Sequence, residues 1–287
     1  MNKYKSIVLI SLAGIVLIGC DNAKSDSKKQ LADDIVNSMI FVKGGRFQMG
    51  DFGPLVGENL PFSPDQDNKP LHWVQLMDFK ISKNKVTWKE FNSWSLAVNE
   101  RYNKYYNKIK NRKVDGEYDK QMLRNIGDNY PASVNWNDAV AFCKWVGAVS
   151  GRNISLPTEA QWEYAARSRG QFRIYANSDN YYDNSLSDDE LNFTHNIAPV
   201  GSFPPNPLGL YDMMGNGSEW VTDWYGEDYY KHSPENEPQG PAQGEYKVIR
   251  GYLGSMFGVQ NITRGKSKPD YEGPGNGFRC VENAPLK

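Results

Sequence analysis

The stretch Leu156-Pro157-Thr158-Glu159-Ala160-Gln161-Trp162-Glu163-Tyr164-Ala165-Ala166-Arg167 carries the clearest local signal in the sequence and anchors the interpretation of the fold. Thr158 and Gln161 have the spacing of a capping box, in which each side chain accepts a hydrogen bond from the other residue's backbone N–H. Acidic residues at the start and Arg167 near the end suit the dipole of a helix. We therefore expect a helix in residues 156–167.

Two further helices are predicted by capping signals of the same kind. Thr87 is followed three residues later by Glu90, which again gives a capping box and predicts a helix over residues 87–98. Asn135 is a good N-cap for a helix over residues 136–149, whose apolar side chains recur on one face.

The rest of the chain favours short strands and loops. The apolar run over residues 39–42 ends at Gly44-Gly45, which predicts a strand followed by a turn. The chain has 26 glycines and 16 prolines, and long helical periodicity is rare. These features predict an irregular α+β domain with little regular secondary structure.

The N-terminus has the pattern of an export signal. Lys3 and Lys5 precede an apolar run over residues 7–18, which is shorter than the roughly 20 apolar residues of a membrane span. The run ends in Leu17-Ile18-Gly19-Cys20, which resembles the lipobox of bacterial lipoproteins. We expect residues 1–19 to be a signal peptide and Cys20 to carry the lipid, palmitate included. The alternative is an ordinary free or buried cysteine.

The sequence then predicts a membrane anchor, a tether and one folded domain. Residues 20–38 are interpreted as the lipid anchor and a flexible tether, and residues 39–283 as the domain. Asp21 follows Cys20 directly, a feature associated with retention in the inner membrane, so we expect the domain to face the periplasm there. The outer membrane is the alternative.

Charge and aromatic content bear on the partners. The net charge of −1 gives no reason to expect nucleic acid, whereas eight Trp and seventeen Tyr suit a recognition surface. Residues 99–129 form a basic, tyrosine-rich segment that interrupts the domain. This insertion is interpreted as a solvated surface helix or loop, with a surface that contacts a partner as the alternative.

Cys143 and Cys280 remain once Cys20 is lipidated. An even number of cysteines in an oxidising compartment suggests a disulfide. A reactive thiol pair is the alternative, but it would want a neighbouring histidine or a CxxC spacing.

Seven blocks in order resemble the formylglycine-generating enzyme, or sulfatase-modifying factor, family. They include the motifs Gly44-Gly45-Arg46-Phe47-Gln48-Met49-Gly50 and Gly277-Phe278-Arg279-Cys280, and the others lie within residues 79–87, 130–139, 156–167, 199–206 and 209–220. The resemblance implies a C-type-lectin-like fold. It also implies a structural disulfide between Cys143 and Cys280.

The resemblance further implies a calcium site. Its ligands would be the side chains of Asp212 and Glu219 and the main-chain carbonyls of Gly215 and Gly217. Oxygen ligands on a glycine-rich turn suit Ca²⁺. The alternative is a turn in which Asp212 caps backbone amides and Glu219 forms a salt bridge.

The copper site of the family's oxidases has no counterpart here. The two catalytic cysteines of those enzymes would fall between Arg250 and Arg264, and this stretch has no cysteine. Monovalent copper prefers thiolate ligands, so no copper is expected. The corresponding candidate groove consists of Arg250, Tyr252, Ser255, Met256 and Arg264.

Two functions follow as hypotheses. The first is a lipoprotein that has lost formylglycine-generating activity and binds an unidentified envelope or secreted protein, as a scaffold, accessory, immunity or inhibitory protein. The second is an oxidoreductase of the same family that uses no copper and acts on a peptide or siderophore-like substrate. His72, His195 and His232 have no metal-ligand spacing, and no catalytic residue is assigned.

Overall fold

The computed structural model of the chain describes residues 26–98, 102, 104–113, 115–178, 180, 197–251 and 258–284. Its fold is α+β, as predicted, and the strands are short. One sheet has the order β1-β4-β10-β5, formed by Met39–Val42, Phe79–Ser82, Val281–Asn283 and Ile154–Ser155. A second has the order β8-β7-β6-β9, formed by Gly265–Ser267, Lys247–Arg250, Ser218–Trp224 and Asn276–Gly277. A separate antiparallel pair joins β2 (Gly45–Met49) to β3 (His72–Leu76).

The three helices predicted from their caps are present. Helices α2 (Trp88–Ala97) and α6 (Glu159–Ala166) both begin with a complete capping box, and Asn135 caps α5 (Trp136–Ser150). In each case a side-chain oxygen accepts a hydrogen bond from a backbone N–H that has no partner within the helix. Two short 3₁₀ helices, η1 (Gly53–Leu55) and η2 (Tyr229–Lys231), lie in loops.

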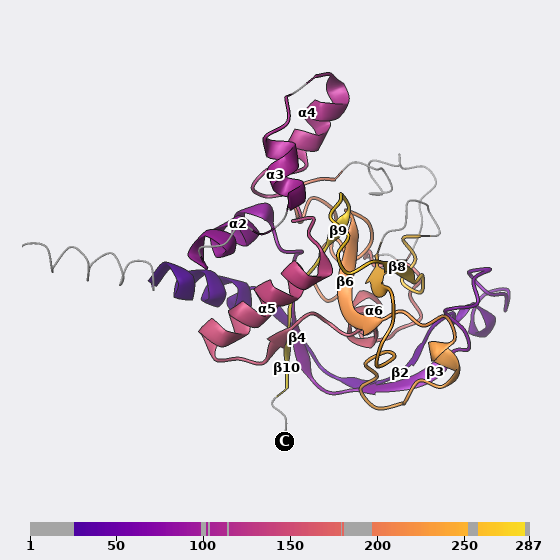
Figure 1. Cartoon of the computed structure of the whole chain (residues 1–287). Helices are drawn as coiled ribbons and strands as arrows, with labels where there is room; N and C mark the ends of the chain where they lie inside the picture. The colour runs from indigo at the N-terminus through magenta and orange to yellow at the C-terminus, as the bar shows by residue number, and fades with distance from the viewer. Residues whose placement is uncertain are drawn as a thin grey trace, which may run out of the picture.

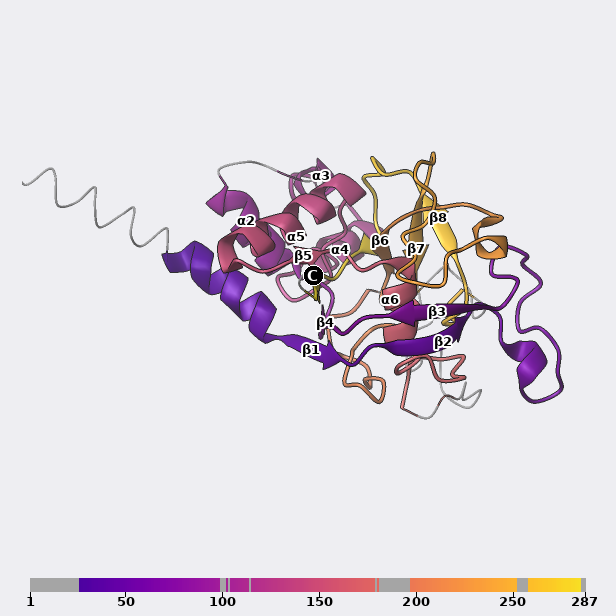
Figure 2. The same cartoon turned by 90° about the horizontal axis from the view of Figure 1, so that it is seen from below.

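The prediction of a flexible tether over residues 20–38 is wrong for its second half. Residues 26–37 form a helix that leads into β1 (Figure 2). Ala32, Ile35 and Val36 are buried in the main apolar cluster of the domain. Their spacing places them on one face of the helix, and this local pattern outweighs the polar average of the segment. The folded part therefore begins before Met39.

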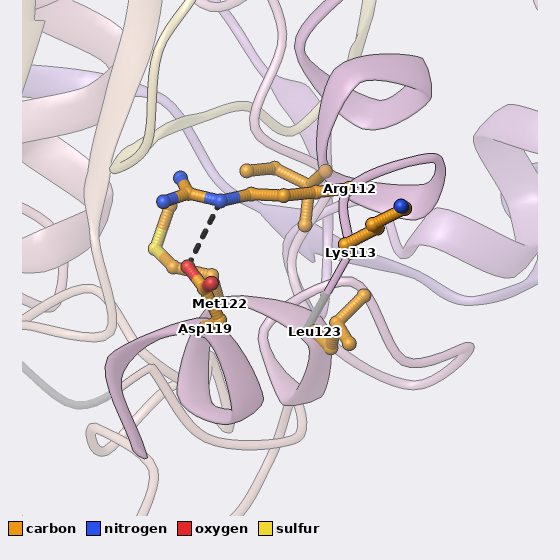
Figure 3. Close-up of a pocket in the computed structure, with 6 residues that line it drawn as sticks. Arg112, Lys113, Asp119, Met122 and Leu123 are labelled. Carbon is orange, nitrogen blue, oxygen red and sulfur yellow. Dashed lines mark ion pairs between the residues drawn. The ribbon is translucent and has the colours of Figure 1, made fainter. Parts of the chain in front are cut away.

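The insertion contributes two helices, α3 (Lys104–Lys110) and α4 (Glu117–Arg124), which extend from the body beside α2 (Figure 1). Tyr105, Ile109 and Met122 are buried and join the main apolar cluster. The two helices face each other across a small pocket, where Arg112 Nε lies 2.9 Å from Asp119 Oδ1 (Figure 3). The insertion is thus a helical surface anchored in the core.

The predicted disulfide is confirmed. Cys143 on α5 is bonded to Cys280, which directly precedes β10, and the two positions are 137 residues apart in the sequence. Both cysteines lie in the same apolar cluster as Phe142 and Phe278. A bridge that closes so long a loop contributes about 2–4 kcal/mol to the free energy of unfolding when its effect is attributed to the entropy of the unfolded chain.

Within the described residues, no helix has the length and apolar character needed to cross a membrane.

Candidate functional site

Helix α6 is the centre of the candidate site because it is buried along its whole length. All eight of its residues are buried, and it packs against β2, β3, β6 and β7 (Figure 2). Glu159 and Glu163 are four residues apart and therefore project from the same face. Two buried carboxylates need partners, because an unpaired charge in an apolar interior is strongly unfavourable.

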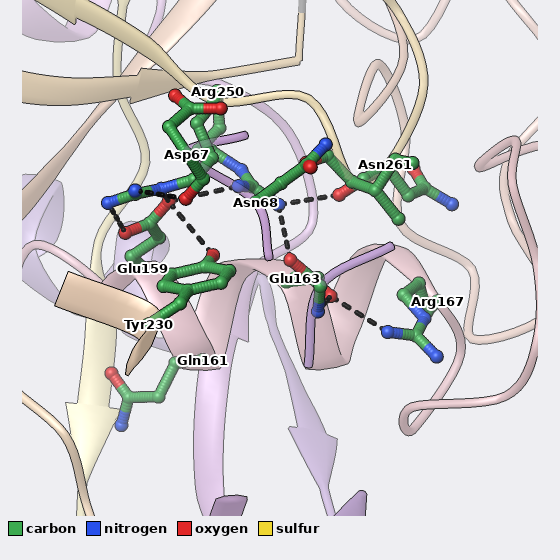
Figure 4. Close-up of polar contacts among 12 residues, drawn as sticks. Asp67, Asn68, Glu159, Gln161, Glu163, Arg167, Tyr230, Arg250 and Asn261 are labelled. Carbon is green, nitrogen blue, oxygen red and sulfur yellow. Dashed lines mark hydrogen bonds and ion pairs between the residues drawn. The ribbon is translucent and has the colours of Figure 1, made fainter. Parts of the chain in front are cut away.

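Glu159 is held by two arginines from the C-terminal third of the chain (Figure 4). Its Oε1 accepts hydrogen bonds from Arg250 Nη1 at 2.9 Å, Arg264 Nε at 2.7 Å and the hydroxyl of Tyr230 at 3.3 Å. Its Oε2 accepts from Arg264 Nη2 at 3.0 Å. Burial alone would raise the pKa of Glu159, but the charges of Arg264 and Arg250 outweigh it and the pKa lies below its usual value.

Glu163 completes the network. Its Oε2 accepts from Arg250 Nη2 at 2.7 Å, and its Oε1 accepts from Arg167 Nη1 at 2.8 Å and from the backbone N–H of Gly50 at 3.0 Å. Three guanidinium groups thus surround two carboxylates, and we call this set the arginine network. Arg250 also donates to the carbonyl oxygen of Asn261 at 2.5 Å.

One carboxyl beside the arginine network has an unusual pKa. Burial, with the negative charge of Glu159 as the next cause, raises the pKa of Asp223 to about 7. Its Oδ2 accepts hydrogen bonds from the backbone N–H of Glu159 at 2.8 Å and from the hydroxyl of Thr222 at 3.0 Å. The side chain of Asp223 therefore titrates near neutral pH inside the domain.

The structure brings together two of the five residues of the predicted groove. Arg250 and Arg264 meet on Glu159, but they are 0% and 6% exposed, so their guanidinium groups face buried carboxylates and not an open surface. Tyr252, Ser255 and Met256 lie outside the described residues. Sequence reasoning missed Glu159 and Glu163 as the partners, although two glutamates on the apolar face of a helix were a signal for buried cations.

A second buried network lies on the other side of Trp162. Glu219 accepts from Arg279 through both carboxylate oxygens, each at 2.7 Å, and from the indole Nε1 of Trp162 at 3.1 Å. The Nζ of Lys85 is 3.6 Å from the Oε1 of Glu219. Burial would raise the pKa of Glu219, but Arg279 and Lys85 together hold it below its usual value.

The four predicted calcium ligands lie around the side chain of Lys85. Its Nζ donates to the carbonyl oxygens of Gly215 and Gly217, while Glu219 pairs with Lys85 as described above. Asp212 Oδ2 accepts from the backbone N–H of Gly201 at 2.9 Å. Among the described residues, no group of three or more His, Cys, Asp or Glu is arranged to hold a metal ion. This set of ligands does not fit Ca²⁺ while Lys85 is in place, because its ammonium occupies the carbonyls of Gly215 and Gly217 and lies 3.6 Å from Glu219. Among the four predicted ligands, only Asp212 has a buried oxygen, Oδ1, without a hydrogen-bond partner.

The two histidines within the described residues each pack against a tyrosine. His72 packs edge-on against Tyr230, with ring centroids 4.5 Å apart, and His232 packs against Tyr229 at 5.9 Å. Burial lowers the pKa of His72 below its usual value. His195 lies outside the described residues.

An irregular α+β domain with a long-range disulfide and two buried ion-pair networks is the class of protein that the fold and the site define. Residues 24–284 match the model of the sulfatase-modifying factor enzyme 1-like domain, and the chain belongs to this family. The family prediction is thereby confirmed.

Individual relatives agree with this assignment. The serine/threonine-protein kinase pkn1 of Chlamydia pneumoniae is 30% identical over 269 residues, which are 91% of this chain and 40% of that protein. The formylglycine-generating enzyme of Streptomyces coelicolor is 36% identical over 180 residues, or 55% of this chain and 54% of that enzyme. The chain thus spans roughly half or less of the length of these two relatives.

A solved structure gives the same result for the fold. The structure of PvdO from Pseudomonas aeruginosa is similar with a TM-score of 0.66 at 27% sequence identity. The similarity covers 86% of this chain and 94% of that one.

Proposed function

We propose that this chain is a cell-envelope lipoprotein that uses the family's domain as a frame for binding an acidic protein segment and does not generate formylglycine. The observation that carries the proposal is that the cysteine side chains of the domain and the arginine side chains of the predicted groove are already paired with other residues of the chain. Cys143 and Cys280 are bonded to each other, and the stretch from Arg250 to Arg264 contains no cysteine. Monovalent copper prefers thiolate ligands, and with no free thiolate at these positions the residues present do not fit that metal.

The charged groups of the predicted groove are likewise engaged. Arg250 forms ion pairs with Glu159 and Glu163, and Arg264 forms one with Glu159. Releasing either guanidinium to bind a substrate would leave a buried carboxylate without its partner, which is strongly unfavourable. The polar interior therefore supports the frame, and recognition is better placed on a surface segment.

The surface we propose is the hollow between α2 and α3. It has a volume of about 320 Å³ and is lined by Leu96, Tyr106 and Lys110 together with asparagine side chains. Leu96 is 80% exposed and supplies an apolar contact at the edge of this hollow. Tyr102 and Tyr106 also line the hollow, and tyrosine is enriched at protein interfaces.

The charge of α3 indicates the chemistry of the partner. Lys104, Lys108 and Lys110 are exposed, and the helix contains no acidic residue. A partner segment with carboxylates next to an apolar side chain would satisfy both the lysines and Leu96. Such charge complementarity acts mainly on specificity and on the rate of association.

Membrane attachment completes the proposal. The described part of the first helix starts at residue 26, so residues 21–25 lie between Cys20 and that part of the helix. Such a segment spans at most about 20 Å when fully extended. If Cys20 carries the lipid, the domain is held next to the membrane surface and its partner must be reached there. We expect Asp21 to keep it at the inner membrane, facing the periplasm.

The test places a photo-crosslinking amino acid at position 96 of the full chain in the producing cells. We expect one protein to be captured from position 96 and not from position 55, which is 50% exposed in η1, in the loop between β2 and β3. The double variant Lys108→Glu/Lys110→Glu should abolish the capture, whereas the exposed control Lys43→Glu should leave it intact. Capture that ignores the charge reversal, or that is equal from both positions, contradicts the proposal.

The oxidoreductase hypothesis makes the opposite prediction for the purified protein. We expect no oxygen consumption with a cysteine-containing sulfatase-type peptide, with or without added copper. Turnover of such a peptide, or of a siderophore-like peptide, would reject the binding proposal in favour of an oxidoreductase that uses no copper thiolate site.

A further inference from the structure

The side chain of Lys85 fills a cage of oxygen atoms. It is 0% exposed, and its Nζ donates to three successive main-chain carbonyls, those of Gly215 at 2.9 Å, Asn216 at 3.2 Å and Gly217. The carboxylate of Glu219 lies 3.6 Å away on another side. An ammonium group has three N–H donors, so the number of carbonyls matches the number of donors.

The backbone is shaped to present these carbonyls. Gly215, Asn216 and Gly217 all have positive φ, at 77°, 53° and 85°. Asparagine is one of the few residues other than glycine that adopt this conformation, and Gly217 has no room for a Cβ, which would lie 2.9 Å from the carbonyl oxygen of Gly275. A turn held in this way is a built cation site.

The lysine is positioned as firmly as the turn. It lies between β4 and the N-cap of α2, and the next residue, Val86, is hydrogen-bonded on both sides. Its N–H donates to the carbonyl of Phe278 at 2.9 Å, and its carbonyl accepts from Ala132 at 2.8 Å. The ammonium therefore reaches the turn from a fixed strand end.

The other groups around the cage are already balanced in charge. Glu219 is bound by Arg279 through two hydrogen bonds of 2.7 Å, so the two cations Lys85 and Arg279 lie near two carboxylates, those of Glu219 and Asp212. Asp212 Oδ2 accepts from the backbone N–H of Gly201, and within the described residues its Oδ1 has no hydrogen-bond partner. Calcium needs six to eight oxygen ligands at 2.3–2.6 Å. A divalent ion added beside Lys85 would give an excess of positive charge and would have to displace the ammonium from its three carbonyls.

We propose that the ammonium of Lys85 is the built-in cation of this turn, so that the domain is closed by its own lysine and neither needs nor accepts calcium. The four residues implied as calcium ligands, Asp212, Gly215, Gly217 and Glu219, then serve as partners of a side chain. Stability of the domain is independent of the calcium concentration.

The first test measures the unfolding temperature of the unaltered protein in 5 mM CaCl₂ and in EDTA. We expect the two temperatures to agree within about 1 °C and equilibrium dialysis with radioactive calcium to show no stoichiometric binding. An ion present at a hundred times its Kd would raise the unfolding temperature by about 5–10 °C. A shift of that size, or one calcium bound per chain, overturns the proposal.

The second test removes the ammonium. Lys85→Met keeps the length of the side chain but leaves three buried carbonyls without a donor, so we expect a lower unfolding temperature that is the same with EDTA and with CaCl₂. Lys83→Met is the matched control, because Lys83 is exposed and its Nζ lies 5.0 Å from the ring of Tyr211. If both variants unfold at the temperature of the unaltered protein, the ammonium does not close the turn and the proposal fails. If Lys85→Met does not fold, the calcium measurements on the unaltered protein decide.

Discussion

Replacing Glu159 by glutamine tests whether the arginine network holds the domain together. The substitution keeps the shape of the side chain but removes the charge that faces Arg250 and Arg264. Glu159 accepts four hydrogen bonds, three of them from guanidinium groups at 2.7–3.0 Å. A glutamine has one acceptor oxygen, and its NH₂ would point at a guanidinium that also donates.

The expected loss of stability follows from the buried charge of Arg264, which no longer faces a carboxylate. Arg250 keeps its ion pair with Glu163 at 2.7 Å, whereas Arg264 loses its ion pair with Glu159 and keeps its hydrogen bonds to the main-chain carbonyls of Asp67 and Gly226. Removing one partner of a buried ion pair typically costs about 3–5 kcal/mol. The free energy of unfolding of a domain is about 5–15 kcal/mol, so this is a large part of the total.

Urea unfolding followed by tryptophan fluorescence measures the loss. The control is Glu235→Gln, which removes the exposed pair of Arg46 and Glu235, 49% and 47% exposed, and should cost less than about 1 kcal/mol. The additional change Arg264→Met should be less harmful in the Glu159→Gln background than alone, since it removes the unpaired cation. A loss for Glu159→Gln as small as that of the control would refute the reasoning.

Four further predictions concern single groups. Because the pKa of Asp223 is raised to about 7 in the folded state, its stabilising contribution is present below the unfolded pKa near 4 and is lost as the pH rises through 7. The difference is up to about 4 kcal/mol, and pH-dependent unfolding should be flatter for Asp223→Asn. Burial lowers the pKa of Lys247 to about 8, and its Nζ lies 4.0 Å and 3.7 Å from the rings of Trp136 and Trp224. Stability from this group therefore increases as the pH rises from 8 towards 10.5, and tryptophan fluorescence should titrate with a midpoint near 8, a transition that Lys247→Met should abolish. Opening the disulfide with Cys143→Ala and Cys280→Ala should lower the free energy of unfolding by about 2–4 kcal/mol in the same urea assay. Cys20→Ser should abolish labelling with radioactive palmitate and move the protein from the membrane to the soluble fraction.

The helices that the sequence predicted correctly are those with local causes. Thr87 with Glu90, and Thr158 with Gln161, satisfy backbone donors within one turn of the same helix, so neighbours in the sequence contain all the information needed. The disulfide followed from the even number of cysteines and from the family resemblance. Neither inference required knowledge of how distant segments pack.

The helix over residues 26–37 was missed because composition was averaged over a window. Lysine, aspartate and serine dominate the segment, but Ala32, Ile35 and Val36 form a narrow apolar face that the domain buries. A short stripe of this kind gains its stability from tertiary packing and not from helix propensity. The same reason explains why the sequence did not predict that α3 and α4 are anchored in the core. Their buried residues Tyr105, Ile109 and Met122 are surrounded by charged residues in the sequence.

The site could not be predicted because its contacts span the chain. Lys85 reaches carbonyls 130 to 132 residues away, and Glu159 pairs with Arg264 across 105 residues. A lone lysine before an N-cap carries no signal that it will be buried. Its role becomes visible only when β4 and the turn at residues 215–217 lie together.

Trp162 links the two buried networks and explains why they act as one frame. Its indole N–H donates to Glu219 at 3.1 Å, while its ring lies 5.2 Å from the guanidinium carbon of Arg250. Buried ion pairs need not add net stability over apolar packing, but each one tolerates a single arrangement of its partners. Segments from both ends of the chain are thus fixed in register around α6. A domain built in this way can vary at exposed positions such as Leu96 without disturbing its interior, which is the property that a binding function requires.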